Sequence, residues 1–112
     1  MNKYYLDNVV KRNKRNPNTF WIPSKEQIEK IKFNDYAQLI FVPHDDEYMT
    51  ERMWVEIYSI EIVNDECVYL GRLANHPMNC PIEYGDRVVF KNENIMNILY
   101  HETEELAFNP FD

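Results

Sequence analysis

Hydrophobic and polar residues alternate along residues 52–63, RMWVEIYSIEIV, and this two-residue period predicts a long strand with one buried face. Residues 34–43, NDYAQLIFVP, contain an unbroken apolar run between Asn-Asp and Pro, which is typical of a buried strand. Two further apolar segments, residues 67–74 and 84–90, have the length of strands. The pattern therefore predicts an antiparallel sheet built from these segments.

The turns between the strands favour a small, bent sheet. Residues 64–66, Asn-Asp-Glu, predict a hairpin, although Asn-Gly is the stronger signal. Residues 33–41 and 84–90 share a pattern: an aromatic residue, Asn34 or Gly85, an aspartate, and an apolar run that ends in Phe. Asn and Gly tolerate a left-handed backbone and aspartate bonds its own turn, so both segments predict tight turns that lead into strands. The architecture that we expect from them is an SH3-like, partly closed barrel.

Two short helices are expected beside this sheet. Ser24 and Gln27 have the spacing of a capping box, and Ile28 and Ile31 give one apolar edge, which predicts a helix of about two turns. Residues 92–100, NENIMNILY, predict a second short helix, capped by Asn92 or Asn94. The fold class is therefore α+β: a small bent antiparallel sheet with a short N-terminal and a short C-terminal helix.

The charge divides the chain into three parts. Residues 1–18 form a basic N-terminal arm with a net charge of +4, whereas the rest of the chain carries −11. Residues 19–100 form a single α+β domain, and residues 101–112 form an acidic C-terminal tail. An acidic body repels phosphates, which argues against nucleic acid as a partner and suits a basic protein or solubility alone. Nucleic-acid binding through KRNKR, residues 11–15, stays a third alternative.

Cysteine use and hydropathy indicate the compartment. The two cysteines are too few for a disulfide scaffold. No segment has the apolar length of a signal-peptide core or of a membrane span. We therefore expect a cytoplasmic protein without a membrane partner. An exposed strand edge would also permit a homodimer.

Alternation along the long strand assigns Trp54 to the outer face of the sheet. The core face is purely apolar and consists of Met53, Val55 and Ile57. The outer face is mixed and consists of Arg52, Trp54, Glu56, Tyr58 and Ile60. One interpretation is that the N-terminal segment, the helix or the tail covers Trp54, so that Trp54→Ala would cost about 3 kcal/mol of stability. The other is that Trp54 and Tyr58, beside Arg52, form an exposed platform for a partner.

Two loops contain residues that could carry chemistry. Residues 44–47, His-Asp-Asp-Glu, are consecutive and lack the pattern of a calcium loop. Residues 75–80 place His76 four residues before Cys80, without a CxxC pair for zinc, and an acidic domain raises the pKa of a thiol. We therefore expect no catalysis, no metal and no cofactor. The alternative is a small-molecule- or metal-dependent enzyme in which the 44–47 and 75–80 loops meet in one pocket.

Three segments, taken together, resemble a known family. They are ERMWVEI, residues 51–57; GRLANHP, residues 71–77; and YGDRVVFKNENIMNI, residues 84–98. Their order and spacing resemble a family of small bacterial domains of unknown function, some of whose members are described as immunity proteins of polymorphic toxin systems. The resemblance covers residues 19–98. The chain departs from the family pattern at Asn34, where a glycine is usual, and at His76, where a small acidic residue is common.

The resemblance implies a non-catalytic binding domain. The polar or amphipathic residues that match the family pattern are Arg52, Trp54 and Asn75, and with Tyr58 they are the candidate partner-binding residues. Gly71, which also matches, is expected to mark a bulge or a close backbone approach. We hypothesise that the chain neutralises or regulates a protein partner, such as a basic toxin, which the acidic body would attract.

Overall fold

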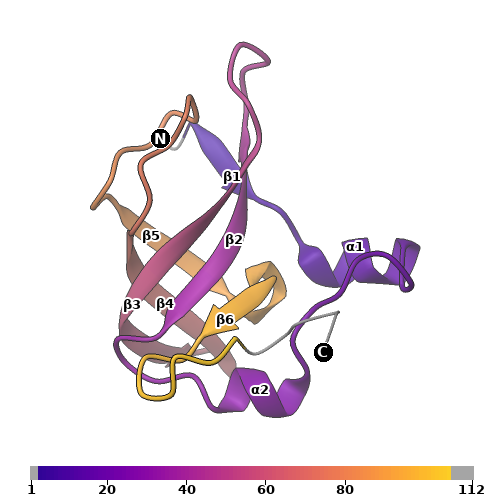
Figure 1. The fold of residues 1–112 in the computed structure, drawn as a ribbon, viewed down its shortest axis with the longest axis vertical. Coiled ribbons are helices and arrows are strands. Elements are labelled where there is room, and N and C mark those ends of the chain that lie inside the picture. The colour runs from indigo at the N-terminus through magenta and orange to yellow at the C-terminus, as the bar shows by residue number, and fades with distance from the viewer. Residues whose placement is uncertain (1–2, 107–112) are drawn as a thin grey trace.

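Six strands form one antiparallel sheet in the computed structural model, which describes residues 3–106 (Figure 1). Four of them follow one another as a meander: β2 (Tyr36–Pro43), β3 (Glu51–Val63), β4 (Glu66–Leu73) and β5 (Arg87–Lys91). Two short strands share the other edge of β2: β1 (Tyr4–Leu6) pairs with its last residues and β6 (Asn97–Leu99) with its first. The sheet curls into a half-barrel, which confirms the α+β class and the bent antiparallel sheet.

Three short helical elements accompany the sheet: α1 (Val9–Arg15), α2 (Lys25–Glu29) and the 3-10 turn η1 (Asn92–Asn94). The predicted capping box begins α2, because the Gln27 N–H donates to Ser24 Oγ at 3.2 Å and the Ser24 N–H donates to Gln27 Oε1 at 2.8 Å. The basic segment 1–18 contributes β1 and α1, and Asn8, which caps α1, donates to Glu93 at 2.6 Å. The N-terminal segment is thereby held against η1.

The predicted second helix at residues 92–100 is wrong. Residues 92–94 form only the 3-10 turn, and residues 97–99 continue as β6 along β2. A short helix is marginal by itself, whereas the edge of β2 offers backbone donors and acceptors that a strand can pair. The strand also lets Ile95 and Ile98 both enter the core, where they are buried.

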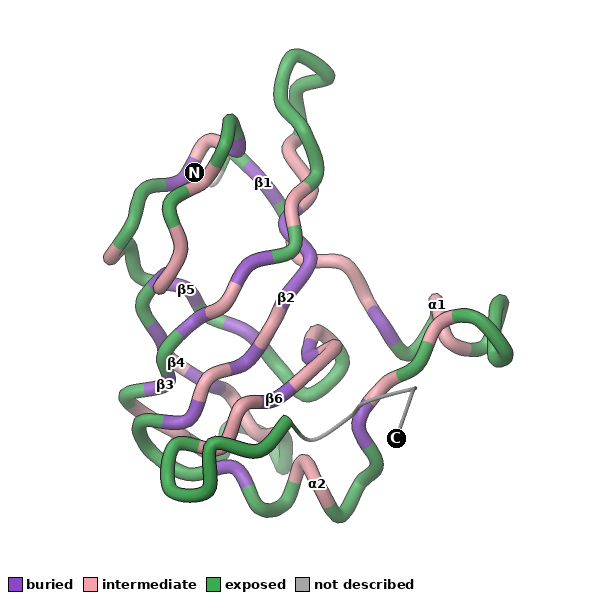
Figure 2. Tube along the Cα trace, viewed as in Figure 1, coloured by how far each residue is buried: buried purple, intermediate pink, exposed green. Residues whose placement is uncertain are grey.

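The hydrophobic core lies on the concave side of the curled sheet. Residues 52–57 of β3 alternate between buried and more exposed positions, whereas β2 contains three consecutive buried residues, Leu39, Ile40 and Phe41 (Figure 2). Met53, Val55 and Ile57 are buried as predicted. Two pairs of aromatic rings pack within this core. The ring centroids of Tyr4 and Phe41 lie 5.2 Å apart, and those of the stacked rings of Tyr69 and Phe90 lie 5.1 Å apart.

A β-bulge in β3 changes which face its residues occupy. Ile57 pairs with Gly71 and Ser59 pairs with Leu70, so Tyr58 is the extra residue. Beyond the bulge the alternation is shifted, and Ile60 packs against the core instead of lying on the outer face beside Trp54. The prediction for Ile60 was therefore wrong, because the period of two does not continue through an inserted residue.

The two related sequence segments fold into the same turn, as predicted. Asn34 and Gly85 both have positive φ, 72° and 86°. The following aspartates each accept a hydrogen bond from the N–H three residues earlier, at 2.8 Å for Asp35 and 2.9 Å for Asp86. The N–H of Asn34 donates to Ile57 and that of Gly85 to Leu73, so each turn extends the pairing of a neighbouring strand.

The hairpin between β3 and β4 has the geometry that two-residue loops require. Asn64 and Asp65 both have positive φ, 51° and 66°, as in a type I′ turn. Asn and Asp tolerate this conformation better than other non-glycine residues. The pairing of β3 with β4 across this turn confirms the predicted hairpin.

None of the helices within residues 3–106 has the length and hydropathy that crossing a membrane requires.

Gly71→Ala should lower the free energy of unfolding by about 3 kcal/mol, because there is no room for a side chain. An added Cβ would lie 2.3 Å from Val55 Cγ1 and 2.7 Å from the Glu56 carbonyl oxygen. Gly85→Ala is the matched control: its Cβ would meet no atom within 4 Å, and only the left-handed φ costs about 1 kcal/mol. Urea unfolding of both variants measures the difference, and equal losses would contradict the close approach at Gly71.

Candidate functional site

The outer face of β3 and β4 carries aromatic rings that are paired with arginines. We call it the aromatic–arginine face and define it by Phe20, Arg52, Trp54, Tyr58 and Arg72. The Arg52 guanidinium lies over the Phe20 ring, 5.9 Å from its centroid, and that of Arg72 lies over Tyr58 at 5.2 Å. Tyr58 is 41% exposed and Trp54 is half-buried. Three of the four predicted site residues therefore belong to one surface.

The N-terminal connector reaches this face beside Trp54. Phe20 precedes α2, and its ring contacts Arg12 of α1 at 5.3 Å as well as Arg52 of β3. The segment that was expected to cover Trp54 thus touches the outer face at Arg52. Trp54 keeps part of its surface in solvent, so its position is intermediate between the two interpretations.

Asn75, the fourth predicted residue, completes the ladder between β3 and β4. Its side-chain oxygen accepts a hydrogen bond from the backbone N–H of Trp54. The N–H of Ala74 donates to the Trp54 carbonyl at 2.9 Å. Asn75 therefore supplies the acceptor that the backbone of β4 would have supplied, at the point where the chain leaves the strand. It positions Trp54.

Glu51 connects the start of β3 to the loop that follows β4. Its carboxylate accepts hydrogen bonds from the backbone N–H groups of Met78, Asn79 and Cys80, at 2.8, 2.9 and 2.7 Å. Partial desolvation would raise the pKa of Glu51, but the three N–H groups outweigh it and hold the pKa below its ordinary value. Sequence reasoning had placed Glu51 in the family pattern without assigning it this contact.

The 44–47 and 75–80 loops, which contain the residues that could carry chemistry, lie against each other. The N–H of Met49 donates to the Asn79 side chain at 2.6 Å, and Asn79 donates to the carbonyl of Glu47 at 3.4 Å. Their histidines contact different aromatic rings, His44 that of Tyr5 and His76 that of Tyr84. Within residues 3–106, no group of three or more His, Cys, Asp or Glu side chains is arranged to hold a metal ion.

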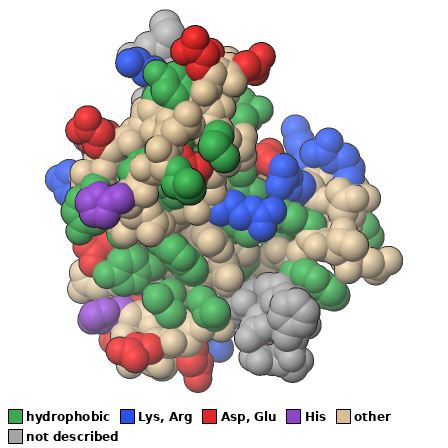
Figure 3. Space-filling model, turned by 45° about the horizontal axis from the view of Figure 1, so that its top comes forward, with side chains coloured by type: hydrophobic (Ala, Val, Ile, Leu, Met, Phe, Trp, Pro, Cys, Tyr) green, Lys and Arg blue, Asp and Glu red, His purple; other side chains and the backbone are tan. Residues whose placement is uncertain are grey.

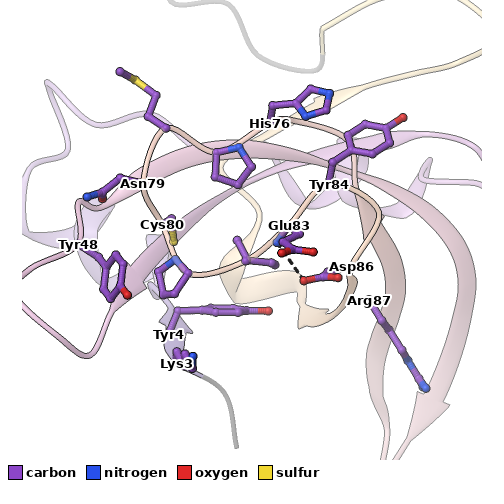
Figure 4. Close-up of a pocket in the computed structure, with 14 residues that line it drawn as sticks. Lys3, Tyr4, Tyr48, His76, Asn79, Cys80, Glu83, Tyr84, Asp86 and Arg87 are labelled. Carbon is purple, nitrogen blue, oxygen red and sulfur yellow. Dashed lines mark hydrogen bonds between the residues drawn. The ribbon is translucent and has the colours of Figure 1, made fainter.

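An open pocket of about 960 Å³ lies beneath the 76–84 loop (Figure 4). The ring of Tyr4 forms part of its floor, and Tyr48 lies at one side. His76 and Tyr84 stack at the rim with ring centroids 4.7 Å apart and an interplanar angle of 12°. The pocket is lined by residues from β1, by Tyr48, by the loop between β4 and β5 and by the start of β5. Of the two loops, 75–80 lines it and 44–47 does not, so the alternative in which both loops meet in one pocket is met only in part.

Cys80 lines the same pocket but is a poor nucleophile at neutral pH. Burial, together with the nearby charge of Glu51, raises the pKa of its thiol to about 11. The thiolate is the reactive form, and this site disfavours it. The upward shift of the Cys80 pKa agrees with the expectation drawn from the acidic composition.

Fold and surface together define a class: a small α+β domain whose curled antiparallel sheet presents an aromatic outer face and a loop pocket at one end. No protein-family model matches the chain, and no curated protein and no solved structure matches it.

Glu51→Gln should lower the free energy of unfolding at neutral pH by about 1–2 kcal/mol, since it removes the charge from three hydrogen bonds at a partly exposed site. The pKa of Glu51 is lowered on folding, so its stabilising effect is present above the ordinary glutamate value of 4.5 and is lost as the pH falls through the lowered pKa. Denaturation curves from pH 7 to pH 3 should show the gap between the two proteins close. Glu61→Gln, on an exposed part of β3, is the control, and a gap independent of pH would contradict the assignment.

Asn75→Ala should cost about 1–2 kcal/mol, because the Trp54 N–H loses its acceptor. Asn75→Asp keeps an acceptor oxygen and should retain most of the stability. Thermal unfolding of both variants separates this positioning role from direct contact with a partner. Unchanged stability in Asn75→Ala would indicate that Asn75 acts at a binding surface instead.

Proposed function

We propose that the chain is a non-catalytic protein-interaction domain that binds a basic protein partner. The single observation that carries this proposal is the aromatic–arginine face. Its rings and guanidinium groups are of the residue types that dominate interface hot spots, namely Trp, Tyr and Arg. The resemblance to immunity proteins supports a finer version, in which the domain neutralises a toxin or regulates the partner by occupying its surface.

The geometry of the face suits recognition because its side chains are already ordered. Arg72 is held over Tyr58 by a cation–π contact and also donates to the Gly85 carbonyl at 3.4 Å. The Tyr36 hydroxyl donates to Glu56 at 3.1 Å in the same part of the sheet. Side chains that are fixed before association lose less conformational entropy on binding, which favours affinity.

The charge distribution supports a basic partner. Basic side chains gather over α1 at the right of Figure 3, and acidic side chains are spread over the top, the left and the bottom of the view. Asp45, Asp46 and Glu47 are all exposed in the loop between β2 and β3. An acidic body accelerates the approach of a basic protein and makes the association sensitive to salt.

An SH3-like architecture is part of the proposal. It is supported by the return of the chain to β2: after β5, one 3-10 turn redirects it so that β6 pairs antiparallel with the first strand of the meander. Such a return is what begins to close a curled sheet into a barrel.

A small-molecule enzyme is the second candidate function. The observation that favours it is the contact between the 44–47 and 75–80 loops through Asn79, next to the pocket that holds His76 and Cys80. The raised pKa of Cys80 weighs against nucleophilic catalysis there. We therefore place this candidate second.

A pull-down with the tagged full chain from the native cell lysate, at low and high salt, tests the proposal. We expect one stoichiometric partner that is lost at high salt, because screening weakens the attraction. Tyr58→Ala and Arg52→Ala should each reduce retention about tenfold, the effect of a hot-spot residue. Phe33→Ala, which truncates an exposed ring outside the face, is the control and should retain the partner.

Trp54→Ala belongs in the same experiment, together with a measurement of its stability, because the ring is half-buried. Capture that does not depend on salt would overturn the steering argument. Absence of any partner at both salts would overturn the proposed function and favour the small-molecule candidate.

A further inference from the structure

Tyr4 presents an unpaired hydroxyl to the pocket beneath the 76–84 loop. Its side chain is only 9% exposed, and its ring packs on Phe41 in the core. Among the described residues the hydroxyl makes no hydrogen bond, yet Tyr4 lines the pocket and Figure 4 shows its oxygen directed along the floor toward Asp86. No side-chain nitrogen or oxygen of the described residues is both buried and unpaired, so the Tyr4 oxygen is open to the pocket, where a bound group can reach it.

Two carboxylates stand beside this hydroxyl. Asp86 uses one oxygen to accept the N–H of Glu83 at 2.9 Å, which leaves its second oxygen available. Within residues 3–106, neither Glu83 nor Asp86 takes part in an ion pair. Burial raises the pKa of Tyr4, and the charges of Cys80 and Asp86 act in the same direction. Tyr4, Glu83 and Asp86 all line the pocket, and Figure 4 draws both carboxylates on the side toward which the Tyr4 oxygen is directed.

The two cations that line the pocket do not occupy this position. Figure 4 shows Arg87 extending away from the carboxylates, and Lys3 lying beneath the Tyr4 ring. The lining also contains exposed aromatic and apolar side chains: Tyr84 and Met78 are 60% and 84% exposed. Aromatic faces attract cations, and apolar walls suit the aliphatic stem of a long basic side chain.

We propose that this pocket receives one arginine or lysine side chain of a basic protein partner. Its charged head lies between the Tyr4 hydroxyl and the carboxylates of Glu83 and Asp86, and its stem lies along Tyr84 and Met78. This inference rests on the proposed function and names a second contact for the same partner, because the arginines of the aromatic–arginine face cannot themselves attract positive charge. The exposed acids of the neighbouring 44–47 loop guide the basic segment toward the pocket.

Titration of the isotope-labelled full chain with N-acetyl-arginine amide, followed by NMR, tests the pocket without the partner. Amide resonances of residues 83–87 should shift and saturate. N-acetyl-citrulline amide has nearly the same shape without the charge and should bind about tenfold more weakly. Tyr4→Phe and Glu83→Gln should each weaken the arginine probe about fivefold, the loss of one hydrogen bond to a charged group.

Matched variants control for folding and for general charge. Tyr5→Phe alters the next residue of β1, which is half exposed and whose ring contacts that of His44 at a tilt. Glu61→Gln removes an exposed acid from β3, and both variants should bind as the unchanged chain does. Undetectable binding, equal binding of citrulline, or tighter binding of N-acetyl-glutamate amide would overturn the proposal. So would wild-type affinity in both pocket variants.

The outcome separates this inference from the proposed function. If the chain captures a partner from lysate but does not bind the arginine probe, the result supports the proposed interaction function and contradicts the proposed arginine pocket. Arginine binding that depends on Tyr4 and Glu83, without any captured partner, supports the pocket and contradicts the proposed function.

Discussion

The close approach of β4 to β3 at Gly71 is the constraint on which the curl of the sheet depends. At this point β3 contains one residue more than its partner, and the added twist bends the long strand over the core. Only a residue without a Cβ lets the Glu56 backbone and Val55 come so near. The bulge leaves Tyr58 on the outer face and returns Ile60 to the core, so the residues of β3 after Tyr58 owe their positions to this local geometry.

Side chains complete the sheet where its backbone pairing stops. Asn75 accepts from Trp54, Glu51 accepts from the 78–80 loop, and Asp35, which is buried, accepts from the N–H groups of Lys32 and His101. Each of these side-chain oxygens accepts from backbone N–H groups that have no strand partner at that point. The start of β3 is thus joined to the loop after β4 at two points, Glu51 and Trp54.

The proposed function draws on two surfaces that follow from this arrangement. The outer face of β3 and β4 supplies rings and guanidinium groups that are held in fixed pairs, and the loop pocket supplies oxygen acceptors beside exposed aromatic and thioether groups. Their charges differ, so a partner that fits both needs apolar or acidic groups for the first and a basic side chain for the second. Such complementarity over two regions gives specificity that a uniformly acidic surface would lack.

The sequence by itself determined the elements whose signals are local. Alternation identified the core face of β3, the Ser24–Gln27 spacing identified the start of α2, and the paired Asn-Asp and Gly-Asp turns followed from the backbone preferences of those residues. Only the tertiary structure decided what depends on contacts between distant segments. Residues 97–99 became a strand because the edge of β2 was open, Ile60 changed face because of a bulge, and Tyr4, Glu83 and Asp86 met because β1 lies beside the loop before β5. A periodic pattern records the neighbours of a residue along the chain, whereas pairing partners and pockets are set by the free energy of packing the whole domain.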